Sequence, residues 1–261
     1  MPEEIKKVLV AALVGADGNE IYELARAGKL ANLQRLMASG VAIPKVAGDK
    51  TAAAGLATLA TGAHSATHGV SAEEECQAQY LWQAAEKASK RGLLLGFPAS
   101  ALPEYHEDHP VELVAPTACD AAYFDQVSSY LLSSPDWDLA FVQVPSTCGL
   151  AEADEFCGKV LDAADFETLR VFVAVPEGGA EGLVVMDGPG VKRGVVVNRP
   201  VELADVAPTV CYLAETPVPA DCEGGVIYQA LEDPDAKILE LQACRRNYER
   251  LRRSSGATPM C

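Results

Sequence analysis

The stretch Lys50 to Val70, KTAAAGLATLATGAHSATHGV, has the outline of a turn that presents a nucleophile. A run of small residues follows an extended segment and opens a helix, which places Thr51 and Ala52 at the helix start. Free backbone N–H groups and the helix dipole favour an anion there, so the frame could hold a phosphate or sulfate. Chemistry would also need an activated hydroxyl or thiol, and the frame holds Ala52 where the nucleophile should stand.

Five other side chains keep a catalytic interpretation open. A hydroxyl next to the turn, a thiol and three carboxylates could make a different site: Thr51, Cys148, Asp17, Glu152 and Glu177. Thr51 and Asp17 also have a simpler interpretation. A threonine beside a helix start is most often an N-cap, and the Asp-Gly pair at Asp17 indicates a turn. A cysteine nucleophile needs a base or a depressed pKa, and no histidine lies near Cys148 in sequence.

The chain has four histidines, in two pairs. His64 and His68 follow the helix that Thr51 opens, and we expect packing and a backbone hydrogen bond there. His106 and His109 lie three apart in the polar stretch PEYHEDHP, where they could ligate a metal or simply face solvent.

The elements that must position these residues follow from alternating short apolar runs and amphipathic stretches, the pattern of a parallel sheet covered by helices. A helical pair is expected before the turn, with Asn32 as an N-cap and Gly40 as a stop. The apolar runs predict strands at Lys7–Leu13, Leu93–Phe97, Asp138–Val144, Leu169–Val175, Leu183–Met186 and Gly194–Val197. The amphipathic stretches predict helices at Asn19–Ala27, Asn32–Ser39, Tyr80–Lys90, Asp120–Leu132, Ala151–Ala163, Leu203–Ala214 and, near the C-terminus, Pro234–Arg253.

Length and composition favour one large α/β domain over residues 1–261. The irregular segment 71–135 could be a reduced cap or lid within it. The net charge of −16 argues against nucleic acid and anionic membranes as partners. The apolar run near the N-terminus is too short for a membrane span and lacks the flanks of a signal peptide, which predicts a cytoplasmic protein. Eight cysteines without a CxxC pair predict free thiols and no structural zinc site.

Three stretches together resemble one family. They are VLVAALVGADGNEIYELARAGKLANLQRLMASGVAIP (Val8 to Pro44), the Lys50 to Val70 stretch, and GVVVNRPVELADVAPTVCYLAETPVPADCEGGVI (Gly194 to Ile227). In this order and spacing they are similar to the alkaline phosphatase superfamily, in particular its type I phosphodiesterase and nucleotide pyrophosphatase branch. The resemblance covers about half of the chain. It implies a three-layer αβα sandwich with a mostly parallel central sheet.

Active members of that family carry two divalent metals, usually zinc, which aspartates and histidines hold at strand ends around a Thr or Ser nucleophile. Here the matching positions do not carry those residues. They are Val14 for the first aspartate, Ala52 for the nucleophile, Cys148 and Glu152 for an Asp and His pair, and Pro176 and Glu177 for the following Asp-His. The late histidine is also missing, since no histidine occurs after His109. Valine, alanine and proline offer no lone pair to a cation, so the sequence predicts neither metals nor the two-metal displacement.

Three hypotheses follow. The first is a non-catalytic relative that acts as a binding or regulatory protein, with a small anion such as phosphate at Thr51 and Ala52. The second is a phosphodiesterase or other phosphate or sulfate ester hydrolase with a relocated site, in which Thr51 or Cys148 is the nucleophile and Asp17, Glu152 and Glu177 surround it. The third is a subunit of a larger assembly or a homo-oligomer, with the C-terminal helix as the docking element.

Overall fold

The computed structural model describes residues 5, 7–71, 75–96, 125, 127–129, 131–132, 137–144, 149–162, 167–235, 239, 242–248 and 250. Cys148, His106 and His109 lie outside these residues, as does most of the expected helix Asp120–Leu132.

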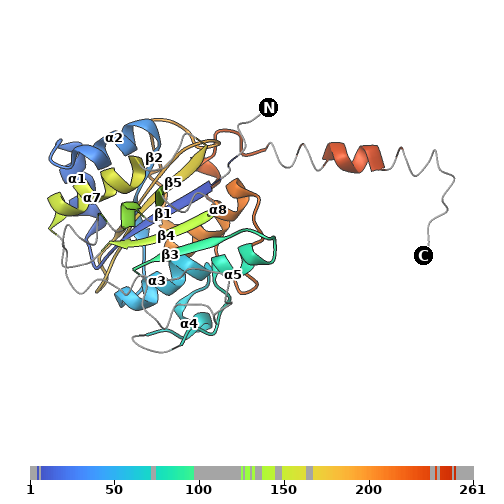
Figure 1. Ribbon diagram of the computed structural model, residues 1–261, viewed down its shortest axis with the longest axis horizontal. Helices are drawn as coiled ribbons and strands as arrows, with labels where there is room; N and C mark the ends of the chain where they lie inside the picture. Colours follow the sequence, from blue (N-terminus) through green and yellow to red (C-terminus); the bar gives the residue numbers. More distant parts are fainter. Residues whose placement is uncertain are drawn as a thin grey trace.

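An eight-stranded sheet forms the centre of the molecule (Figure 1). Its strands are β1 (Lys7–Val14), β2 (Val41–Ala47), β3 (Gly92–Leu95), β4 (Leu139–Val144), β5 (Thr168–Val175), β6 (Gly182–Asp187), β7 (Val195–Val196) and β8 (Val201–Glu202). They lie in the order β3-β4-β1-β5-β6-β2-β7, and β8 also pairs with β2. Of these strands only β6 runs antiparallel to its neighbours, so the predicted mostly parallel sheet is confirmed.

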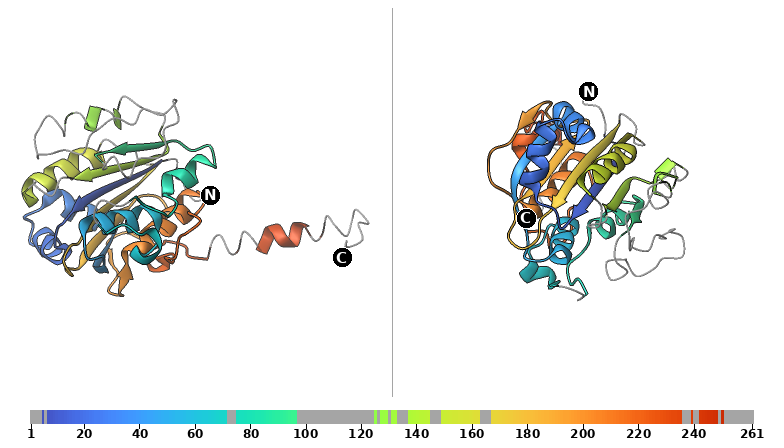
Figure 2. Two further views of the ribbon diagram at one scale, coloured as in Figure 1. Left: turned by 90° about the horizontal axis from the view of Figure 1, so that it is seen from below. Right: turned by 90° about the vertical axis from the view of Figure 1, so that its left-hand side faces the viewer.

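Helices cover both faces of the sheet, which confirms the three-layer αβα architecture (Figures 1 and 2). One face carries α1 (Gly18–Arg26), α2 (Ala31–Ser39) and α7 (Leu150–Asp162). The other carries α3 (Ala52–Thr61), α5 (Leu81–Glu86) and α8 (Val206–Ala214). Shorter helical segments lie between these elements, among them α4 (Ser65–His68), η2 (Leu203–Asp205) and η3 (Tyr228–Ala230).

Alternation along β1 explains the two cores. Successive strand side chains point to opposite faces of a sheet. Val8, Val10, Ala12 and Val14 accordingly pack under α3, α5 and α8, whereas Leu9 and Leu13 pack under α1, α2 and α7. Because both faces are covered, the strand is apolar throughout, as is usual for a parallel sheet.

Asn32 is not the N-cap of α2, contrary to the sequence prediction. The cap position is Leu30, which makes no side-chain cap bond. Instead, the Asn32 backbone N–H and side-chain amide both donate to Asp154 Oδ2 in α7, at 3.1 and 3.2 Å, and Leu33 N–H donates to Asp154 Oδ1 at 2.8 Å. A carboxylate from a neighbouring helix therefore caps α2. The predicted stop at Gly40 is confirmed as the C-cap.

Part of segment 71–135 belongs to the central layers. Strand β3 forms the edge of the sheet, and α5 packs beside it, with Trp82 buried against Phe141 of β4. Residues 97–124, where a cap or lid would lie, are outside the described residues. Within the described part of the chain, no helix is long and apolar enough to cross a membrane.

Candidate functional site

Three of the positions predicted from the sequence lie at one edge of the sheet, the edge at which strands β1, β2 and β5 end. Val14 ends β1 and pairs in register with Val175, the last residue of β5, so Pro176 directly follows Val14's neighbour. Ala52 begins α3 on the segment that follows β2. Val14 is 7% exposed and belongs to the same apolar cluster as Val175 and Leu56, and Ala52 packs against that cluster. Side chains without lone pairs therefore fill this part of the edge.

Asp17 is the N-cap of α1 rather than a free carboxylate. Its Oδ1 accepts hydrogen bonds from the backbone N–H groups of Asn19 (2.9 Å) and Glu20 (3.4 Å). The expected turn at Asp17 is therefore a helix start, where a carboxylate also complements the dipole.

Thr51 is the N-cap of α3, as the sequence predicted. Its Oγ1 accepts from Ala54 N–H at 3.2 Å and donates to Ser71 O at 2.6 Å. Both interactions are structural: the first satisfies a helix-start donor and the second ties the far end of the 51–71 stretch back to its beginning. An anion at this helix start would accept hydrogen bonds from the first-turn backbone N–H groups that do not donate to Thr51.

The loop between β5 and β6, residues 176–181, touches both of the other loops at this edge. Gly178 N–H donates to Lys50 O at 3.2 Å, and Pro176 packs so closely on Gly48 that a Cβ there would lie 2.4 Å from Pro176 Cγ. On the β1 side, Gly18 N–H donates to Glu181 O at 2.8 Å and the Asn19 side chain donates to Glu181 Oε2 at 2.8 Å. The loop therefore bridges the β1–α1 and β2–α3 connections directly.

The two glutamates predicted as site residues, Glu152 and Glu177, are both exposed. Glu152, in the first turn of α7, accepts from Gly149 N–H at 3.0 Å and is exposed. Glu177 is exposed in the β5–β6 loop. Among the residues that the structure describes, no group of three or more His, Cys, Asp or Glu side chains could hold a metal ion.

A buried polar chain that the sequence did not reveal lies beside Thr51. His68 Nδ1 accepts from Val70 N–H at 3.1 Å, so Nε2 carries the proton and donates to Thr58 Oγ1 at 2.9 Å. The Thr58 hydroxyl in turn donates to Asp49 Oδ2 at 2.5 Å. His68 and Thr58 are buried, at 0 and 3% exposure. The expected packing and backbone bond of His68 are confirmed, and the chain fastens α4 and α3 to the segment after β2.

The described cysteines are free thiols: two are buried, Cys76 and Cys222 are partly buried, and Cys244 is exposed. Cys157 and Cys211 are buried, and burial raises the pKa of Cys211 to about 12. Such thiols are poor nucleophiles because the thiolate is not formed at neutral pH.

A pH-dependent stability follows from His68. Burial lowers its pKa from 6.5, more than nearby Asp49 raises it. The native state therefore keeps the imidazole neutral at pH values where the unfolded chain takes up a proton. The contribution of His68 to the free energy of unfolding is fully present above pH 6.5, and it is lost as the pH falls towards the pKa of His68 in the folded state.

We expect urea midpoints at about pH 7.5 and about pH 5.5 to differ less for His68→Gln than for the unchanged protein. Comparing the two proteins removes the contribution of the many surface carboxylates. An equal or larger loss of stability on acidification in His68→Gln would contradict the assignment of the neutral imidazole.

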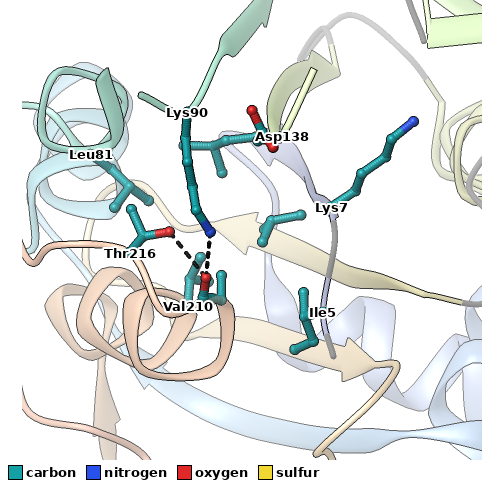
Figure 3. Close-up of a pocket in the computed structure, with 10 residues that line it drawn as sticks. Ile5, Lys7, Leu81, Lys90, Asp138, Val210 and Thr216 are labelled. Atoms are coloured by element: carbon teal, nitrogen blue, oxygen red, sulfur yellow. Dashed lines mark hydrogen bonds between the residues drawn. The ribbon is translucent and has the colours of Figure 1, made fainter. Parts of the chain in front are cut away.

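A small pocket of about 10 Å³ lies at the opposite edge of the sheet, where the strands begin (Figure 3). This is close to the space that one water molecule needs. Lys90 reaches into it from the start of β3, and its Nζ donates to Ala214 O at 2.6 Å, which the Thr216 hydroxyl also approaches at 3.3 Å. The ammonium thus neutralises the C-terminus of α8, a structural role.

The comparisons with known proteins address the fold. No family model matches the chain, and no curated protein matches it by sequence. Among solved structures, a phosphonate monoester hydrolase from Silicibacter pomeroyi superposes with a TM-score of 0.66 at 14% identity, over 85% of this chain and 76% of that one. One from Agrobacterium radiobacter gives 0.66 at 17% identity, over 89% and 77%.

A third relative in structure is murine ectonucleotide pyrophosphatase/phosphodiesterase 5, with a TM-score of 0.63 at 9% identity over 81% of this chain and 96% of that one. These hydrolases share the alkaline phosphatase-like fold. The chain therefore has that fold, as the sequence resemblance implied.

Proposed function

We propose that this chain is a non-catalytic relative of the phosphate, phosphonate and sulfate ester hydrolases whose fold it shares, and that it acts as a binding or regulatory protein. The observation that carries the proposal is the apolar edge formed by Val14, Ala52 and Pro176. A two-metal displacement needs carboxylate or imidazole ligands and a nucleophile, and these three side chains supply neither.

The β5–β6 loop supports the same proposal. Its contacts with Lys50 and Gly48 on one side and with Gly18 and Asn19 on the other draw the loops at the strand ends together. Packing of this kind stabilises the fold at the ends of these strands.

We place the proposed binding site at the start of α3, where the ligand is a small anion such as phosphate. The hydrogen bonds of Thr51 with Ala54 and Ser71 hold the backbone of that helix start in place. The dipole of this ten-residue helix favours negative charge at its N-terminus. A murine pyrophosphatase/phosphodiesterase 5 variant described as inactive, with alanine in place of a threonine, was solved in complex with AMP. In that protein a ligand with a phosphate stays bound after an alanine has replaced a threonine.

The experiment pairs metal analysis with hydrolysis. We expect purified protein to hold no stoichiometric zinc or manganese and to leave bis(4-nitrophenyl) phosphate intact when either metal is added. An active phosphodiesterase assayed in parallel is the control for the conditions. Stoichiometric zinc together with turnover that Thr51→Ala or Asp17→Asn abolishes would overturn the proposal and establish the relocated hydrolase site.

The anion is tested separately by thermal unfolding. Phosphate should raise the melting temperature more than sodium chloride of the same ionic strength, because a ligand that binds only the native state stabilises it. Equal effects of phosphate and chloride would remove the anion from the proposal.

A further inference from the structure

Strand β7 lies at one end of the strand order, and among the described strands it pairs with β2 alone. On the β2 side, Val195 N–H donates to Gly40 O at 3.2 Å, and Val197 N–H donates to Ala42 O at 2.9 Å. Alternate residues of a strand direct their backbone groups to opposite edges, so the N–H and C=O of Val196 point away from β2. Among the residues that the structure describes, none bonds to either group. The sheet therefore has an open hydrogen-bonding position at Val196.

The residues around this position carry positive charge, although the chain as a whole has a net charge of −16. Residues 188–201 contain three basic residues and no acidic one. The first, Lys192, donates its Nζ to Gln229 O at 3.0 Å. The other two, Arg193 and Arg199, are exposed, and neither has an ion-pair or hydrogen-bond partner for its side chain within the described part of the chain. Two guanidinium groups without a partner there thus flank the open backbone position in sequence.

The side chain at the centre of β7 is also uncovered. Val196 is 40% exposed, whereas Val195 and Val197 pack in the apolar cluster beneath α3 and α8. A strand added beside β7 would bond to the backbone of Val196 and bring a side chain of its own next to this valine.

The arginines determine which kind of strand can be added. In an antiparallel pairing of two β7 strands centred on Val196, Arg193 of one copy would lie opposite Arg199 of the other, because each is three residues from the centre. Like charges in such a pair repel, and charged side chains commonly protect an edge strand from pairing with its own kind. The same charges attract a strand that carries carboxylates.

We propose that β7 binds an extended acidic segment of another protein, which joins the sheet as an additional strand. The backbone of the segment bonds to Val196, a β-branched side chain covers that valine, and carboxylates on either side pair with Arg193 and Arg199. This site is separate from the start of α3, because β7 pairs with the first two residues of β2 and α3 follows the end of β2.

The probe is a fluorescein-labelled heptapeptide with two glutamates at each end and Val-Thr-Val between them. Fluorescence anisotropy measures its binding to the full chain. The unchanged protein binds the peptide, and the affinity falls as sodium chloride rises because the paired charges are screened. The double variant Arg193→Glu with Arg199→Glu weakens binding about tenfold or more. The control, Lys29→Glu with Lys87→Glu, makes the same change in net charge at two other exposed residues and leaves binding nearly unchanged.

Two further changes test the backbone bonds separately from the charges. Val196→Pro removes the outward N–H but keeps the two bonds to β2, since proline is tolerated on an edge strand whose N–H faces solvent, and it weakens binding about fivefold. Methylation of the central backbone nitrogens of the peptide removes donors without any change in the protein, and it weakens binding as well. Urea midpoints verify that each protein variant is folded.

Four results would overturn the proposal. The first three are no detectable binding of the acidic peptide, equal binding by the arginine double variant and the unchanged protein, and equal binding of the methylated and unmethylated peptides, which would indicate charge attraction without strand addition. The fourth is a dimer of the unchanged protein, detected by sedimentation, that Val196→Pro dissociates, because the edge would then belong to a second copy of the chain.

Discussion

Replacing Val14 with aspartate should lower the free energy of unfolding by about 3 kcal/mol or more, and added zinc should not restore it. Val14 is buried among Val175, Leu56 and their neighbours, where a carboxylate finds no cation and no described ligand partner. The matched control is Val14→Thr, which keeps the shape and adds only a hydroxyl, for a cost of about 1–2 kcal/mol. Urea unfolding with zinc and with a chelator measures both variants.

The opposite outcome would be informative. If Val14→Asp folds almost as stably as the unchanged protein and zinc raises its melting temperature, then this edge is an open site that lacks one ligand. That result would contradict the packed edge on which the proposed non-catalytic function depends.

Gly18→Ala should cost about 3 kcal/mol, because the added methyl group has no room. A Cβ at Gly18 would lie 2.2 Å from the Gly182 carbonyl carbon and 2.4 Å from Leu183 N, and backbone atoms cannot rotate aside as a side chain can. The close approach also places Gly18 N–H on Glu181 O. Denaturant midpoints measure the effect.

Gly178→Ala is the control for this prediction, since Gly178 belongs to the same β5–β6 connection. Nothing lies within 4 Å of a Cβ there, but its φ of +67° is a left-handed conformation, and an L-residue pays only about 1–2 kcal/mol for it. Gly18 has no left-handed φ, so a loss at Gly18→Ala no larger than that at Gly178→Ala would show that the backbone of β6 shifts to admit the methyl group and that the packing of α1 on β6 is not tight.

The sequence predicted the strands that are buried on both faces. β1, β4, β5 and β6 are continuous apolar runs bounded by turn residues, and each was found within a residue or two of its ends. The segment before the turn is expected only to be extended, and it forms β2, whose sequence VAIPKVA contains Pro44, although proline rarely lies inside a sheet. The structure accommodates it: β7 pairs with Val41 and Ala42, β8 pairs with Val46 and Ala47, and Pro44 lies between these two short pairings.

Part of the candidate site was predictable because it is local. The Thr51 cap follows from the composition of its own helix start, and the sequence itself shows that Val14 is no metal ligand and Ala52 no nucleophile. The Asp49, Thr58 and His68 chain was not predictable in the same way. It forms because left-handed glycines at Gly62 and Gly69 turn the chain back on itself, and residue types alone do not fix that path.

The place of β1 between β4 and β5, which both follow it far along the chain, affects how the protein folds during synthesis. β1 leaves the ribosome before both of its neighbours, β4 and β5, so Val8 cannot pair until Leu139 has been synthesised, nor Val14 until Val175 has been. β2 likewise waits for β6. Pairings this distant in sequence slow folding and leave apolar strands uncovered in the nascent chain. The apolar strands of the first half therefore stay without their sheet neighbours until β6 has been synthesised, which is the stage at which we expect aggregation to compete with folding.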